Sequence, residues 1–216
     1  MTEPAGGAGT AKKGIPAWVI VLIVVFGGLP CIAGLVGTVA IVVPKMQEKQ
    51  RQAACMNNLA QLGQIWLMRS QANRRRAQAH SGPGLLLDFL TDADVKRGDE
   101  RIFVCTGDPV AHAPETAEEH RAYAAVDLDN VPRSLCSYAG RDFRNFPIDV
   151  GGAVNREPVA ACLNHRRGAV VLFEAGDVQL VSREELGLGD EDEVIVGPDS
   201  KSPMLRKLRF GDGSVR

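Results

Sequence analysis

A continuous run without a single charged side chain covers residues 15–43, near the start of the chain. A bilayer core about 30 Å thick is crossed by roughly 20 helical residues, so a run of about 29 is long enough to span it. Inside lipid, every backbone N–H and C=O must be bonded within the segment, which makes an α-helix the expected state. We therefore predict a transmembrane helix over residues 15–43, with the lipid bilayer as its partner.

Three other interpretations of this run fit the residues less well. A buried helix of a soluble domain is rarely apolar on all sides over such a length. A cleaved secretory signal has an apolar region of roughly 7–15 residues followed by a small-residue cleavage site, and neither feature matches. A hairpin turning at residues 27–30 would leave two arms too short to cross a bilayer. A kink at Pro30 within one helix is expected instead.

Composition divides the remainder of the chain. Residues 1–14 are small, polar and rich in Gly and Ala, which predicts a disordered tail. Beyond residue 43 the chain is long enough for one domain that buries about 70% of its unfolded surface. The formal net charge of −1 gives no reason to expect a nucleic-acid partner.

Residues 44–80 keep a helical apolar rhythm but carry enough polar residues to stand in water, so we predict an amphipathic stem helix. Four of its residues recur at spacings of three and four and share one face: Cys55, Leu59, Leu62 and Trp66. Polar residues fall on the other face: Asn57, Gln61 and Gln64. The apolar face of such a helix must be buried against another element, and a sheet packed onto it would bury this face.

The segments after the stem predict an α+β domain over residues 81–216. Two β-rich runs, 169–173 and 178–181, are separated by four residues that include Gly176, which predicts a hairpin with Gly176 at positive φ. We also expect a short helix or a turn at 84–90, a strand at 102–105 and a strand pair at 194–196 and 205–210. The expected fold is thus a long N-terminal helix laid against an antiparallel sheet.

Four short motifs follow one another in a fixed order. The first contains Pro44, Cys55, Asn57, Asn58, Leu59 and Gly63; the others lie at 101–109, at 137–140 (Ser-Tyr-Ala-Gly) and at 164–178, where His165 and Gly176 stand at a characteristic spacing. In this order they resemble type II secretion pseudopilins, above all prepilin-type proteins with a C-terminal His-x9-Asp-Gly motif. Ala175 stands where that family has Asp. The resemblance covers roughly residues 40 to 182 and implies a pilin-like fold.

The start of the chain departs from that family. Its peptidase site is a Gly followed by a Phe-Thr-Leu-Ile-Glu-like stretch, whereas here Gly14-Ile15 is followed by Pro16, and Val19 stands in the position of the Glu. In the family that Glu neutralises a neighbour's N-terminal amine, because an unpaired charge in lipid is costly. Two functions therefore remain. One is a structural pseudopilin of a type II secretion or type IV pilus-like system; the other is a membrane-tethered binding module that does not polymerise.

Basic residues flank both ends of the apolar run, so orientation is not settled by charge. Lys12 and Lys13 precede it, and three basic residues follow it closely, which slightly favours a cytoplasmic C-terminal domain by the positive-inside rule. The short N-terminal tail and the resemblance favour the opposite orientation. We predict a single-pass protein of the inner membrane with its C-terminal domain in the periplasm, where other pseudopilins or secretion-apparatus proteins are the expected partners.

Candidate sites are few. Cys105, Cys136 and Cys162 lie in short, strand-like surroundings, and a disulfide between two of them or three buried free thiols are both expected outcomes. Carboxylates in one acidic loop are candidates for Ca²⁺: Asp190, Asp192 and Asp199. His165 is expected to be a structural hydrogen-bonding residue, since its three-residue spacing from Cys162 on an extended segment gives no reason for contact. No catalytic motif, phosphate loop or Cys/His metal spacing is present, so we expect no enzyme and no other cofactor.

Overall fold

The computed structural model describes residues 16, 18, 29–91, 95–96, 98–148 and 156–211, without the side chains of residues 29–41 and 74. The chain divides into two compact units, Met1–Gln47 and Glu48–Arg216. Helix α2 (Leu29–Ala72) begins in the first unit, continues through Pro44 and ends in the second. The predicted tail at 1–14 and much of the predicted span at 15–43 lie outside the described residues. Within the described part, no helix is both long and apolar enough to cross a membrane.

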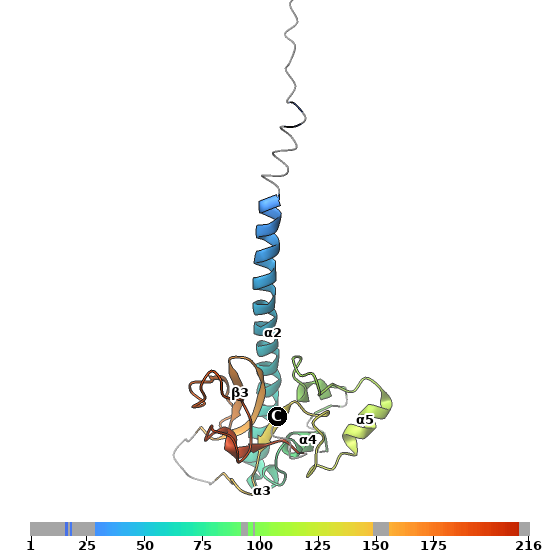
Figure 1. The fold of residues 1–216 in the computed structure, drawn as a ribbon. Helices are drawn as coiled ribbons and strands as arrows, with labels where there is room; N and C mark the ends of the chain where they lie inside the picture. Colours follow the sequence, from blue (N-terminus) through green and yellow to red (C-terminus); the bar gives the residue numbers. More distant parts are fainter. Residues whose placement is uncertain are drawn as a thin grey trace, which may run out of the picture. The chain divides into compact units, whose positions relative to one another are not determined.

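The second unit is an α+β domain with an antiparallel sheet. Its helices are the last part of α2, then α3 (Arg74–Ala77), α4 (Gly84–Thr91), the 3-10 helix η2 (Glu100–Phe103), α5 (Ala117–Ala124) and the 3-10 helix η3 (Leu205–Lys207). Its strands are β1 (Tyr138–Arg141), β2 (Pro158–His165), β3 (Gly168–Phe173), β4 (Val178–Ser182) and β5 (Leu208–Arg209). Among the described residues these form one five-stranded sheet in the order β4-β3-β2-β1-β5 (Figure 1). The expected α+β class with a long N-terminal helix is confirmed.

The sheet separates two hydrophobic cores because successive strand side chains point to opposite faces. On β2 and β3, Cys162, Val170 and Leu172 belong to the core that also contains the apolar residues of α2. Their neighbours Ala161 and Val171 belong to a second core. That second core is completed by residues from the C-terminal part of the chain, namely Leu186, Leu188, Val196, Leu205, Leu208 and Phe210. The sheet is therefore covered by α2 on one face and by the C-terminal segment on the other.

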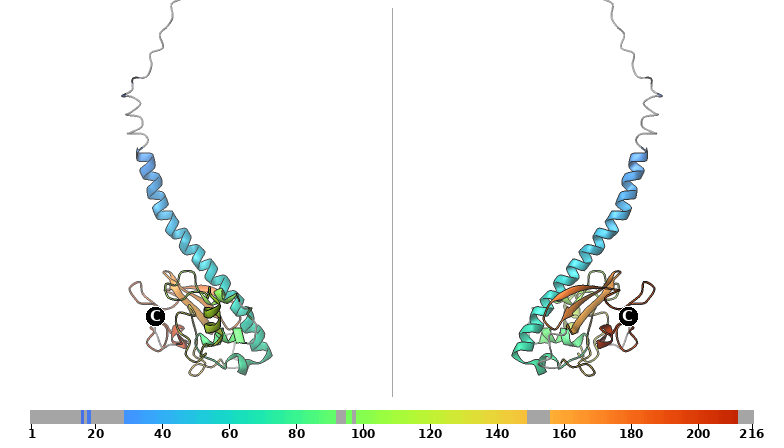
Figure 2. Two further views of the ribbon diagram at one scale, coloured as in Figure 1. Left: turned by 90° about the vertical axis from the view of Figure 1, so that its right-hand side faces the viewer. Right: turned by 90° about the vertical axis from the view of Figure 1, so that its left-hand side faces the viewer.

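The stem face predicted from its spacing is the face that the domain covers. Cys55, Leu59, Leu62 and Trp66 are all buried in the core shared with the sheet, whereas the polar residues of the other face are exposed: Asn57, Gln61 and Gln64. Figure 2 shows the strands alongside this C-terminal part of α2. The Trp66 indole N–H donates to the Glu174 carbonyl oxygen at 3.2 Å, which ties the helix to the hairpin turn. The prediction for the two faces of the stem is confirmed.

The helix and the β3–β4 hairpin meet at two glycines. Gly176 lies in the turn between the strands with φ of 82°, as expected, and a Cβ added there would stand 2.4 Å from Leu67 Cδ1. Gly63 is the facing residue of α2, and its added Cβ would stand 2.7 Å from Leu172 Cδ1 and 2.9 Å from the Gly176 oxygen. Two positions of the pseudopilin-like motifs thus allow the helix backbone and the turn to touch.

Replacing Gly176 with alanine is expected to lower the free energy of unfolding by about 3 kcal/mol, because the new methyl group adds a clash to the cost of a left-handed backbone. Gly187→Ala is the matched control, since Gly187 has φ of 73° but no atom of the described residues lies within 4 Å of its added Cβ. It should cost only about 1 kcal/mol. Urea denaturation of the two variants measures the difference; equal losses would show that the close approach has no energetic weight.

Two strand predictions were wrong. Residues 102–105 were expected to form a strand, but Glu100–Phe103 is a 3-10 helix, and the Asn58 amide of α2 donates to the carbonyl oxygens of Arg101 at 3.3 Å and Val104 at 3.2 Å. A helix side chain thus satisfies these carbonyls instead of a neighbouring strand. Residues 194–196 are not a strand, and the 205–210 run contributes only β5, which pairs with β1.

The stem helix is shorter than predicted. It was expected to run to residue 80, but α2 ends at Ala72 and α3 covers Arg74–Ala77. Between them, the Asn73 side-chain oxygen accepts a hydrogen bond from the Arg76 backbone N–H at 3.1 Å, in the manner of an N-terminal cap. The polar side chain of Asn73 therefore starts a new helix where the periodic pattern alone predicted continuation. Of the helix and the turn considered for residues 84–90, the structure has the helix, α4.

Candidate functional site

A buried cluster of three cysteines and one histidine lies between α2 and the sheet. Its members are Cys55, Cys105, Cys162 and His165, and their sulfur and nitrogen ligand atoms all lie within 4.8 Å of one another. Cys55 comes from α2, Cys105 from the turn after η2, and Cys162 and His165 from β2. Three segments that are far apart in the sequence therefore contribute to one polar cluster inside the larger hydrophobic core.

The three cysteines reach this point for separate local reasons. Cys55 is on the buried face of α2, one helical turn before Leu59. Cys162 is on the helix-facing side of β2, where it pairs across the strands with Tyr138 and Val170. Cys105 is held by its backbone, because its N–H donates to the Ser137 hydroxyl oxygen at 2.8 Å. The carbonyl of Cys105 also accepts from the Asp108 N–H at 2.9 Å, which closes a tight turn.

His165 joins the cluster because β2 has an irregularity. In a regular strand, residues three apart point to opposite faces, which would place His165 away from Cys162. Between these two residues, however, β2 advances three positions while β3 advances only two, from Val170 to Gly168. An extra residue of this kind is a β-bulge, and bulges re-aim side chains. The expectation that Cys162 and His165 do not meet was wrong for this reason.

Among the described residues, the His165 imidazole makes no hydrogen bond. Its side chain is 0% exposed, and neither Nδ1 nor Nε2 has a hydrogen-bond partner there. The nearest carboxylate oxygen is Glu48 Oε1 on α2, 3.5 Å from Nδ1. The expectation that His165 is a structural hydrogen-bonding residue does not match this environment. Burying a polar group without a hydrogen bond lowers the free energy of unfolding by about 1–3 kcal/mol. The burial of both ring nitrogens of His165 therefore needs an explanation.

The cluster favours one thiolate among its sulfurs. The neighbouring thiols of Cys162 and Cys55, followed by the His165 imidazole and the Gly107 backbone N–H, hold the pKa of the Cys105 thiol far below its usual value. The same contact with Cys105 raises the pKa of Cys55, and burial raises the pKa of Cys162. The three thiols therefore titrate as one coupled group, in which the contacts of Cys105 favour its thiolate.

The fourth described cysteine in this unit, Cys136, is not part of the cluster. Its sulfur lies 3.7 Å from the Tyr138 carbonyl oxygen, and burial raises the pKa of its thiol to about 12. All four are free thiols in the structure. Of the three residues considered for a disulfide, the fold brings Cys105 and Cys162 together and leaves Cys136 apart. The cluster has the chemistry either to bind a thiophilic metal ion or to oxidise to one disulfide.

The acidic loop considered for Ca²⁺ is arranged differently. Asp192 forms an ion pair with Lys201 and also accepts from the Gly189 N–H at 2.8 Å. The Lys201 ammonium, followed by that backbone N–H, lowers the pKa of Asp192. Asp190 and Asp199 are exposed. Within the described residues, these three carboxylates do not form a group close enough to hold a metal ion.

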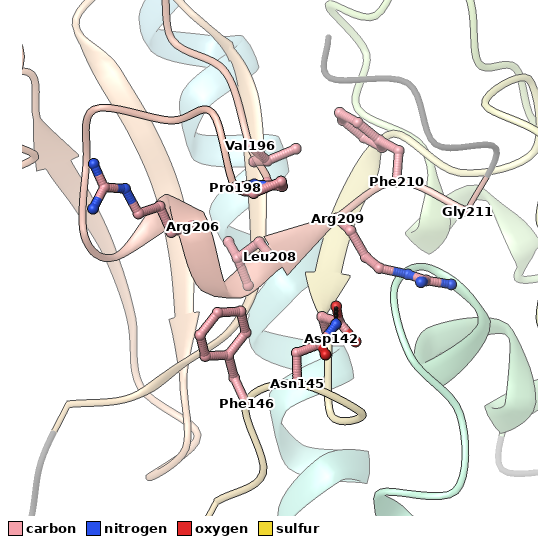
Figure 3. Close-up of a pocket in the computed structure, with 11 residues that line it drawn as sticks. Asp142, Asn145, Phe146, Val196, Pro198, Arg206, Leu208, Arg209, Phe210 and Gly211 are labelled. Atoms are coloured by element: carbon pink, nitrogen blue, oxygen red, sulfur yellow. Dashed lines mark hydrogen bonds between the residues drawn. The ribbon is translucent and has the colours of Figure 1, made fainter.

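A pocket of about 560 Å³ opens on the other side of the sheet, beside β5 (Figure 3). Its lining is mostly apolar and includes Val196, Leu208 and Phe210. Figure 3 shows its two arginines, Arg206 and Arg209, pointing away from each other, and the Arg206 Nε donates to the Ser200 carbonyl at 2.6 Å. The charged groups of this pocket do not converge on one point.

Comparison with known proteins does not assign the chain to a family. No protein-family model, no curated protein and no solved structure matches the chain. The cysteine–histidine cluster itself was missed at the level of sequence, because its ligands do not have the short spacings of familiar metal motifs. The only available signal was that three of the four stand in the pseudopilin-like motifs: Cys55, Cys105 and His165.

Proposed function

We propose that this chain is a membrane-anchored structural protein of the pseudopilin type, acting within a type II secretion or type IV pilus-like apparatus. The periplasmic part is a pilin-like α+β domain built on the continuation of the anchoring helix. In this role the domain contributes a rigid surface and the apolar N-terminal segment fixes it to the inner membrane.

The observation that supports this proposal most directly is where the motif residues meet. Cys55, Leu59 and Gly63 from the first motif face the sheet on α2. They meet Cys105 of the second motif, Tyr138 of the third, and His165 and Gly176 of the fourth at one junction of helix and sheet. Asn58 adds hydrogen bonds to the second motif. Residues whose pattern resembles pseudopilins thus carry the contact between a long helix and its sheet.

The second candidate is a membrane-tethered module with the same domain that does not polymerise. The observation in its favour is Val19, which stands where pseudopilins have the Glu that pairs with a neighbour's N-terminal amine. Both candidates share the anchor and the domain, and they differ in whether the N-terminus is processed.

Two measurements test the proposal. Membranes prepared from cells that produce the chain should retain it after carbonate extraction, and protease added to spheroplasts should digest its C-terminal domain. N-terminal sequencing of the purified protein then separates the two candidates: a start near Ile15 supports assembly, and an intact Met1 supports the tethered module. Recovery of the full chain in the soluble fraction would contradict both.

A further inference from the structure

We propose that Cys55, Cys105, Cys162 and His165 bind one Zn²⁺ ion, which fixes helix α2 to the β-sheet. This inference is independent of the proposed function, because it concerns only the four side chains and their surroundings. The same site serves a pseudopilin and a tethered module alike.

The donor atoms suit zinc in kind and number. Three cysteine sulfurs and one imidazole nitrogen form one of the usual sets of structural zinc sites, whereas Ca²⁺ and Mg²⁺ require oxygen ligands. A tetrahedral site with Zn–S bonds of about 2.3 Å places neighbouring donor atoms about 3.8 Å apart. The four donors here all lie within 4.8 Å of one another, so side-chain shifts of about 1 Å or less complete the shell. Because the protein fills all four positions, the site is structural.

His165 supplies the second, independent observation. Its imidazole is fully buried, neither ring nitrogen makes a hydrogen bond among the described residues, and a metal bond satisfies one of them. Glu48 Oε1 lies 3.5 Å from Nδ1 and is placed to accept a hydrogen bond from a protonated Nδ1. The lone pair of Nε2 is then available for the ion. A carboxylate behind a zinc-bound histidine is the usual outer partner of such ligands. Glu48 is thus a positioning residue.

Two hydrogen-bond donors beside the site suit a cluster of negatively charged thiolates. Binding releases up to three thiol protons to solvent and leaves three sulfurs with negative charge around the divalent ion. The Gly107 backbone N–H already bonds Cys105. The buried Tyr138 hydroxyl makes no hydrogen bond that meets normal geometry within the described part of the chain, and it lies next to Cys55, whose thiolate would be a charged acceptor for it. A disulfide between any two of the three cysteines removes two ligands, so oxidation and zinc binding exclude each other.

The experiment uses the full-length chain, produced in zinc-supplemented medium and extracted into mild detergent under reducing conditions. Elemental analysis should find about one zinc per chain. Replacement of the zinc with Co²⁺ should give the charge-transfer band of thiolate ligands and the intense visible bands of a tetrahedral ion. Reloading the chelator-stripped protein with Zn²⁺ should raise the thermal midpoint by about 10 °C, since the ion binds only the folded state.

Matched variants locate the ion. Cys105→Ala and His165→Ala should lose the zinc, whereas Cys136→Ala should keep it, because Cys136 is an equally buried thiol outside the cluster. Glu48→Gln should keep the cobalt bands but bind zinc about 10-fold more weakly. If a ligand variant does not fold, the cobalt spectrum of the unmodified chain still decides. Zinc-free protein without thiolate–cobalt bands, or a peptide in which two of the three cluster cysteines are joined by a disulfide, overturns the proposal.

Discussion

Truncation of Trp66 to alanine is expected to destabilise the domain by about 4 kcal/mol, the largest effect of any single side chain on the stem. Trp66 is 1% exposed and stacks on the Phe143 ring with centroids 5.7 Å apart. Its indole N–H also bonds the Glu174 carbonyl in the hairpin turn. The substitution therefore removes apolar burial, leaves a cavity and removes a hydrogen bond at the same junction.

The control for Trp66 lies two residues away on the same helix. Met68 is 61% exposed, so Met68→Ala should change the free energy of unfolding by less than about 0.5 kcal/mol. Trp66→Phe keeps an aromatic ring but loses the hydrogen bond and part of the volume, and it should fall between the two. Guanidinium denaturation followed by circular dichroism measures all three. A Trp66→Ala variant as stable as Met68→Ala would contradict the packing of the stem against the sheet.

Replacement of Arg141 with methionine is expected to cost about 3 kcal/mol. The Arg141 side chain is 3% exposed, and its guanidinium pairs with Glu157 at 2.8 Å and donates to the carbonyl oxygens of Phe146 at 2.6 Å and Pro158 at 2.9 Å. Removing one partner of a buried ion pair costs about 3–5 kcal/mol because the other partner is left behind. We expect the lower end, since Lys207 also pairs with Glu157, at 2.7 Å.

Arg144 provides the comparison for Arg141. It pairs with Asp129 at 2.9 Å, but the two side chains are 62% and 53% exposed. Exposed pairs contribute about 0–1 kcal/mol, so Arg144→Met should be nearly neutral. Losses of similar size at the two arginines would mean that burial of Arg141 has no energetic consequence.

Local periodicity was sufficient to predict the buried face of the stem and the hairpin. The spacing of Leu59, Leu62 and Trp66 correctly identified the face that the sheet covers, and Gly176 was correctly placed in the turn. These predictions hold because each depends on residues within one or two helical turns or one hairpin. Where a longer-range contact decides the conformation, as at the Asn58 hydrogen bonds to the 101–104 backbone, prediction from the local pattern was wrong.

The cysteine–histidine cluster depends on contacts that no local pattern contains. Cys55 and Cys105 are fifty residues apart, and only the packing of α2 on β2 brings them to Cys162. His165 enters through a bulge, and one extra residue in a strand reverses the face of every residue after it. A bulge arises from how two strands pair, so it cannot be predicted from the sequence of the bulged strand alone.

A long helix with one apolar face, followed by strands able to cover it, can be inferred from the order of the amino acids alone. That much follows from the period of the helix and of the strand, which are properties of the backbone. Only the tertiary structure decided that three thiols and an imidazole share one buried point. Strand register and helix–sheet packing set that juxtaposition, and both are settled by the whole core at once.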